Sequence, residues 1–137
     1  MIQNGIYRID TSEAVKIAQK AGNSGDMLLL ELQGKEIQSW EDYINVLDEV
    51  IRFPTSCLVW GYGVNRYHDW MRDLDWLEKE GYVIIIHDYG RFLEREPVVK
   101  KQIMDDFSDL ILPWWQADVE NCVVEGKAKP FNVYLVD

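Results

Sequence analysis

The side chains best suited to chemistry lie in the middle of the chain. Asp69 and Asp73 are four residues apart, so on a helix they would share one face. His68 precedes Asp69, and His87 precedes Asp88 at the end of an apolar run. These residues fit an acidic helix face that binds a basic partner, a His/Asp cluster for metal-assisted or acid–base chemistry, or an ordinary solvated face.

The enzyme interpretation has little support from motifs. The sequence contains no HExxH motif, P-loop, dinucleotide fingerprint or serine elbow. We therefore expect no catalytic residue, no metal and no cofactor. A small metal-dependent phosphoesterase or hydrolase using His87, Asp88, His68 and Asp69 is kept as the alternative.

Composition limits the class of partner. The 137 residues are 47% hydrophobic and carry a net charge of −10, which indicates one ordered domain and argues against direct nucleic-acid binding. The charge permits steering toward a basic protein, although acidity also simply favours solubility. No apolar run reaches the roughly 20 residues of a membrane helix, so no membrane contact is expected. The start of the chain does not look like an export signal, so we expect a cytoplasmic protein with Cys57 and Cys122 reduced.

Alternating strand and helix patterns surround the acidic residues. Short apolar runs, the one at residues 82–87 rich in β-branched residues, predict strands, and apolar residues at helical spacing predict helices. The predicted strands are residues 6–9, 27–32, 82–87 and 131–136, and the predicted helices are residues 11–22, 40–53, 65–80 and 97–112. Residues 117–124 fit neither pattern. The alternation predicts a single-domain α/β fold over residues 1–137 with a small, mostly parallel sheet, to which residues 1–26 offer a possible strand and helix.

Several residues mark where these elements begin and end. Asp10 is placed to cap the first helix, and Pro113 is expected to stop or kink the last one. Gly81 is expected to end the acidic helix in a left-handed conformation. Gly61 and Gly63 allow a sharp turn or a close approach before that helix.

Aromatic residues border the same glycines. Trp60 and Tyr62 are candidate interface anchors, because aromatic side chains dominate binding hot spots, or they pack over the helix. Trp76 is a candidate to cover the acidic surface.

Short motifs along residues 27–137 resemble the barstar family, whose members are small intracellular inhibitors of secreted bacterial ribonucleases. The motifs are LQGKEIQS at residues 32–39, Phe53-Pro54, Trp60-Gly61 and RDLDWL at residues 72–77, followed by the strands at residues 82–87 and 131–136. The resemblance implies a barstar-like fold with three strands, to which the N-terminus is able to add a fourth. It also implies an inhibitor that is not an enzyme.

The resemblance assigns roles only through an alignment. With Gly61 on the family's loop glycine, Asp69 falls on the key acidic position of the inhibitory helix, and His68 falls on the neighbouring tryptophan position. Asn65 then replaces an earlier acidic residue, and Gly63 replaces a loop asparagine. If Gly63 and Asn65 instead match the family's Gly-x-Asn element, Trp70 meets the tryptophan position and Met71 the acidic one. The first alignment is preferred because it keeps both the glycine and the carboxylate.

The resemblance thus implies an immunity protein that blocks the active site of a basic ribonuclease toxin. A monomer bound to one toxin molecule is expected, and a non-inhibitory adaptor for a basic protein is the remaining alternative. The residues expected to bind the partner are Trp60, Gly61, Tyr62, Gly63, Asn65, Arg66, His68, Asp69, Asp73 and Trp76.

Overall fold

The computed structural model describes residues 3–137, and its centre is one four-stranded parallel sheet. The strands lie in the order β1-β4-β3-β2, and every neighbouring pair is parallel. Their bounds are Ile6–Ile9 for β1, Met27–Gln33 for β2, Gly81–His87 for β3 and Phe131–Val136 for β4. The α/β prediction is confirmed, and the fourth strand does come from the N-terminus.

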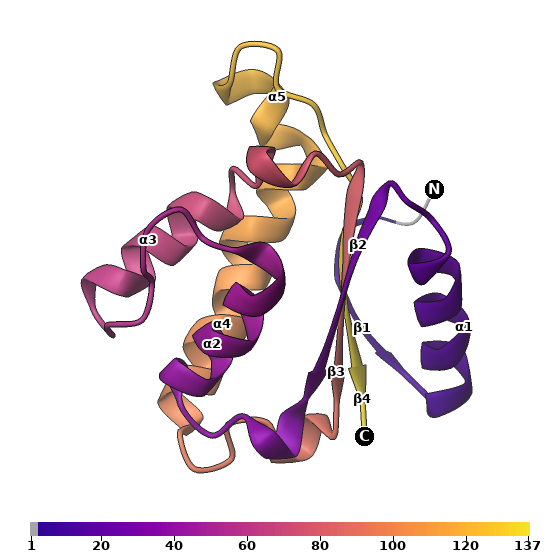
Figure 1. Ribbon diagram of the computed structural model, residues 1–137, viewed down its shortest axis with the longest axis vertical. Helices are drawn as coiled ribbons and strands as arrows, with labels where there is room; N and C mark the ends of the chain where they lie inside the picture. Colours follow the sequence, from indigo (N-terminus) through magenta and orange to yellow (C-terminus); the bar gives the residue numbers. More distant parts are fainter. Residues whose placement is uncertain (1–2) are drawn as a thin grey trace.

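Helices cover both faces of the sheet. They are α1 at Thr11–Gly22, α2 at Trp40–Ile51, α3 at Tyr62–Met71, α4 at Pro97–Asp106 and α5 at Val119–Cys122. In Figure 1, α1 lies alone on one face and the other helices lie on the opposite face, with α3 farthest from the sheet. Within residues 3–137, no helix has the length and apolar character needed to cross a bilayer.

The two faces enclose cores of different size. Alternate residues of β3 point to opposite sides, so Ile84 and Ile86 join the large core under α2 and α4, whereas Val83 and Ile85 join the small core under α1. Every residue of β4 is buried. Such continuous burial is typical of parallel strands covered on both faces.

The N-terminal strand and helix complete the sheet. β1 pairs with β4 along its whole length, which covers an edge that would otherwise be open. The Asp10 carboxylate accepts a hydrogen bond from the Glu13 amide at 2.8 Å, so the predicted cap is confirmed.

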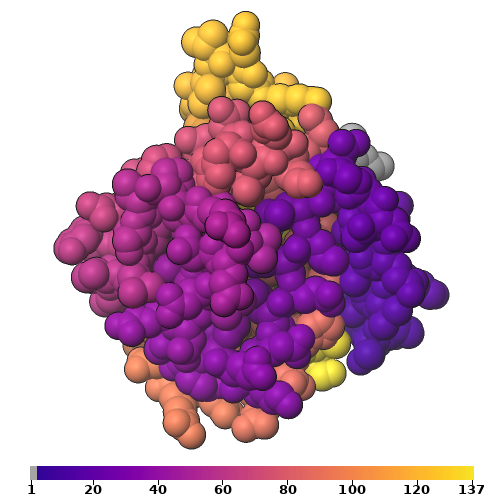
Figure 2. Space-filling view, in the orientation of Figure 1, coloured from indigo at the N-terminus to yellow at the C-terminus, as the bar shows by residue number. Residues whose placement is uncertain are grey.

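Of the two outcomes predicted for Pro113, a stop or a kink, the helix that begins with α4 does not show the stop. It continues to Cys122 through two π-helical segments, Phe107–Ile111 and Trp114–Asp118, which flank the proline. Proline removes a donor and crowds the preceding turn, and the wider π turns accommodate it. In Figure 2 the end of this long helix and the segment after it, in yellow, project from the body of the molecule.

The acidic helix is shorter than predicted and begins earlier. α3 ends at Met71, and Leu74 adopts a left-handed conformation with φ 54°. The Asp73 carboxylate accepts a hydrogen bond from the Asp75 amide at 3.1 Å, which is the local turn that competes with a helix. Gly81 does not end a helix but begins β3. A Cβ there would lie 2.7 Å from the Met27 sulfur, so a larger residue would make the Met27 side chain shift.

Candidate partner-binding site

Helix α3 buries one stripe and exposes the other. Gly63, Tyr67 and Met71 are buried at a four-residue spacing. A Cβ on Gly63 would lie 2.7 Å from the Cys57 carbonyl oxygen, so the glycine lets the helix pack directly on the loop before it. The exposed stripe carries Tyr62, Asn65, Arg66 and Asp69.

The start of α3 is open to solvent. Gly61 precedes it with φ 104°, a conformation that favours glycine, and no side chain caps the helix. Its first turn contains no acidic residue. The amide groups at this end therefore face outward beside the exposed aromatic side chains.

Asp69 presents its carboxylate at the surface. Its side chain is 74% exposed, and one oxygen accepts a hydrogen bond from Arg72 Nη2 at 3.2 Å. Arg72 also donates to the His68 carbonyl oxygen and lies over the Trp114 ring. An exposed ion pair of this kind contributes less than about 1 kcal/mol to stability. A cationic side chain of a partner can therefore displace Arg72 from Asp69.

Two large aromatic side chains lie at the amino-terminal end of the exposed stripe of α3. Tyr62 is 60% exposed and Trp60 is 46% exposed. Arg66 lies over the Tyr62 ring and donates to the Ser56 carbonyl oxygen at 3.2 Å. Trp60 meets the buried Trp40 edge to face, with 5.2 Å between ring centroids. Exposed aromatic rings that also contact neighbouring side chains are suited to anchor a protein partner.

His68 points away from the exposed stripe. Its Nε2 atom lies 2.8 Å from Asp106 Oδ2 on α4, at ion-pair distance but outside hydrogen-bond alignment. Asp106 is 6% exposed, and its other oxygen accepts a hydrogen bond from Gln102 at 2.7 Å. His68 therefore ties α3 to α4. Sequence analysis overlooked Asp106, although its position three residues after Ile103 puts it on the apolar side of α4.

Asp73 and Trp76 lie outside the helix. Asp73 is exposed but follows the end of α3, so it does not share a helix face with Asp69. Trp76 is half-buried and donates to the Ile51 carbonyl oxygen at 2.7 Å. It also meets Trp70 edge to face, and Trp70 donates to Thr55. These tryptophans fasten the segments on either side of α3 to the end of α2.

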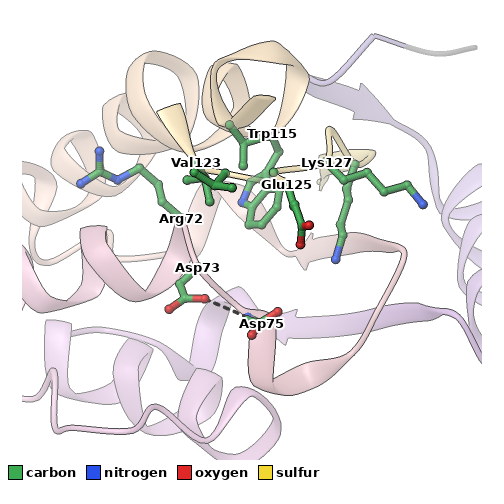
Figure 3. A pocket seen from close by; sticks show the side chains of 11 residues that line it. Arg72, Asp73, Asp75, Trp115, Val123, Glu125 and Lys127 are labelled. Atoms are coloured by element: carbon green, nitrogen blue, oxygen red, sulfur yellow. Dashed lines mark hydrogen bonds between the residues drawn. The ribbon is translucent and has the colours of Figure 1, made fainter. Parts of the chain in front are cut away.

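A cavity of about 590 Å³ lies beyond the carboxyl end of α3. Figure 3 shows Asp73 and Asp75 opposite Glu125 across it and Trp115 at its back, while the head of Arg72 extends away from Glu125. Its lining carries three carboxylates and three cationic side chains. The charges balance, so this cavity does not select a partner of one sign.

Beneath α3, buried polar groups hold the helix to α2. The Tyr43 and Tyr67 hydroxyl groups lie 2.6 Å apart, and burial raises the pKa of both. Trp40 donates to the Cys57 carbonyl oxygen at 2.9 Å. Burial also raises the pKa of the Cys57 thiol to about 11, so this thiol stays protonated and unreactive at neutral pH.

The residues of the enzyme alternative are divided between two places. His87 lies at the carboxyl end of β3, 3.0 Å from Glu31 of β2, whereas His68 and Asp69 belong to α3. Across residues 3–137, no group of three or more His, Cys, Asp or Glu side chains is arranged to hold a metal ion. The geometry gives this alternative no support.

Fold and surface together define an acidic α/β protein whose outermost helix has exposed aromatic side chains at its amino-terminal end and an exposed carboxylate near its carboxyl end. The family model described as Barstar (barnase inhibitor) matches residues 27–135, so the chain belongs to the barstar family. The match begins at β2 and leaves β1 and α1 outside it. Comparisons with curated proteins and with solved structures give no match.

Proposed function

We propose that this protein is an immunity protein that binds a bacterial ribonuclease toxin and blocks its active site. The observation that carries the proposal is the exposed Asp69 carboxylate on the helix that begins beside the exposed Trp60 and Tyr62, in a member of a ribonuclease-inhibitor family. The net charge of −10 complements a basic ribonuclease.

The mechanism is substrate mimicry by a rigid carboxylate. A ribonuclease holds a phosphodiester with cationic side chains, and a carboxylate accepts the same charge-assisted hydrogen bonds. Asp69 enters that site once the toxin's cations replace Arg72. Close charge pairs in the barnase–barstar complex set the scale for such a contact, several kcal/mol when one partner is removed.

The remaining site residues divide into two roles. Trp60, Gly61, Tyr62, Asn65 and Arg66 are exposed and contact the toxin directly. In the same proposal the buried part of the site orients them: Gly63 sets the distance between α3 and its loop, and His68 fixes α3 on α4. Asp73 and Trp76 flank the carboxyl end of the helix.

The test is capture from a lysate of the source cells, followed by a ribonuclease assay. The immobilised protein is expected to retain a basic ribonuclease that is inactive while bound, and Asp69→Ala is expected to release it. Glu13→Ala on the opposite face is the matched control. Capture of a basic protein without ribonuclease activity would favour the adaptor alternative, and equal retention by Asp69→Ala would exclude the role given to Asp69.

The salt dependence of association provides a second test, because the proposal includes steering by the net negative charge. The rate of association with the ribonuclease is expected to fall as ionic strength rises, because salt screens long-range steering. Stopped-flow fluorescence of the exposed Trp60 offers a signal for this measurement. An association rate that does not change with salt would contradict steering by the net negative charge of the protein.

A further inference from the structure

A second groove opens next to the loop that precedes α3. It has a volume of about 530 Å³ and lies between that loop and the N-terminal ends of α2 and α4. Its apolar lining consists of Trp40, Leu58, Trp60, Val98 and Val99. Val98 is 74% exposed, so its side chain is accessible to a partner.

Two carboxylates border this groove. Glu41 belongs to the first turn of α2, and Glu96 immediately precedes α4. Both are exposed, and within residues 3–137 neither forms an ion pair. The Glu96 side chain does not cap α4 either. Each helix end contributes roughly half a positive charge, so the two full negative charges leave the groove negative.

The charge of this groove distinguishes it from the other two cavities. The cavity beside Asp73 contains as many cations as carboxylates. A third cavity, near Asn4 and Gln116, has a single charged side chain, Asp118, in its lining. The groove at Trp60 combines exposed aromatic and apolar surface with uncompensated negative charge.

We propose that this groove binds an arginine or lysine side chain of the ribonuclease, at a point separate from the Asp69 contact. The cationic head lies against the Trp60 ring and donates hydrogen bonds to Glu41 and Glu96, while its methylene groups contact Leu58 and Val98. Arginine is the better fit, because its planar group stacks on an indole and bonds a carboxylate at the same time.

The position of the groove supports this occupant. Trp60 lines the groove and also borders the exposed stripe of α3, so one partner surface is able to cover both. The proposal rests on the proposed function for the identity of the partner. The presence of a cation subsite is tested without the ribonuclease.

The first experiment titrates the whole protein with N-acetyl-arginine methylamide and follows the Trp60 indole signal by NMR. The neutral control ligand is the citrulline analogue, which has nearly the same shape. We expect a saturable shift with the arginine compound alone. The shift should disappear in the Glu41→Gln/Glu96→Gln variant and persist in the Glu13→Gln/Glu120→Gln variant, which loses the same charge at exposed sites outside the groove.

Asp69→Ala separates this test from the test of the proposed function. This variant should bind the arginine compound normally, because Asp69 does not line the groove. Equal shifts with both compounds, or an unchanged shift in the Glu41→Gln/Glu96→Gln variant, would overturn the subsite even if Asp69 proves essential for inhibition. Retained arginine binding with no effect of Asp69→Ala on the ribonuclease would overturn the proposed function alone.

The second experiment measures dissociation of the captured ribonuclease. We expect the Glu41→Gln/Glu96→Gln variant to release it about tenfold faster, since a close contact acts mainly on the dissociation rate. The Glu13→Gln/Glu120→Gln variant should change only the association rate, through net charge. Identical dissociation rates for the two variants would show that the ribonuclease does not use the groove.

Discussion

Helices α1 and α3 have similar lengths, 12 and 10 residues, but differ in how they are fastened. A side chain caps α1, and its buried Ala14 and Ala21 pack on the sheet. α3 has no side-chain cap, begins at a glycine with positive φ and lies outermost in the molecule. Its buried side rests on other helices and loops, whereas α1 rests on strands.

The contrast shows how one chain separates stability from recognition. α1 is held by a side-chain cap at its first turn and by one apolar face that packs on the sheet. Both interactions are made within the chain. α3 depends on buried polar contacts from beneath, the Tyr43–Tyr67 pair and the His68–Asp106 pair. These contacts fix the helix while leaving its outer carboxylate and aromatic side chains available to a partner.

The largest expected effect concerns binding, and it should appear on α3 only. Asp69→Ala is expected to weaken ribonuclease binding by about 4 kcal/mol, because it removes a carboxylate that becomes buried among cations. Its effect on unfolding should be small, since Asp69 is exposed. Titration calorimetry or inhibition kinetics measures the binding change. If Glu13→Ala on α1 weakened binding equally, the two helices would not differ in function.

The second-largest expected effect concerns stability and the His68–Asp106 contact that joins α3 to α4. His68→Ala leaves Asp106 buried without its partner and is expected to lower the free energy of unfolding by about 2 kcal/mol. Urea unfolding of both single variants and of the double variant measures the coupling between the two residues. Additive effects would mean that the pair does not fasten α3.

Alkaline pH is expected to lower the free energy of unfolding through the two buried tyrosines beneath α3. Burial raises the pKa of Tyr43 and Tyr67, so the folded state keeps these protons when the unfolded state, with a pKa near 10.0, loses them. Their stabilisation is complete below pH 10 and falls above it by about 1.4 kcal/mol per pH unit for each tyrosine. Absorbance at 295 nm is expected to show their ionisation only at the pH values at which circular dichroism shows unfolding. Full ionisation with an intact fold would show that this pair is accessible.

The smallest effect belongs to α1. Asp10→Ala removes a cap and is expected to lower the midpoint of thermal unfolding by about 4 °C, with ribonuclease binding unchanged. Hydrogen bonds to Glu13 and Ser12 lower the pKa of Asp10 below 3.8. The cap is therefore fully formed above pH 3.8 and is lost as the pH falls through the lowered value. Calorimetry of both proteins at neutral and acidic pH measures this difference, which should vanish in acid.

Local patterns predicted most of the fold. The four strands lie where short apolar runs place them, and the Asp10 cap and the close approach at Gly63 follow from residue type. The prediction for Gly81 was wrong, because strand packing overrides its local preference, and π turns carry the helix past Pro113 without the stop that was one of its two predicted outcomes. Of the residues predicted to bind a partner, Asp69, Tyr62 and Trp60 are exposed, but His68 is turned inward. Its partner Asp106 is 38 residues away along the chain, beyond the reach of any local pattern.

By itself, the sequence determined the order of strands and helices, the negative charge and the carboxylate at position 69, because these depend on residue type and short-range spacing. Only the tertiary structure decided where α3 ends, which of its side chains remain exposed, and that Glu41 and Glu96 border one groove. The physical reason is that burial and charge pairing depend on contacts between distant segments. Those contacts exist only once the helices have packed on the sheet.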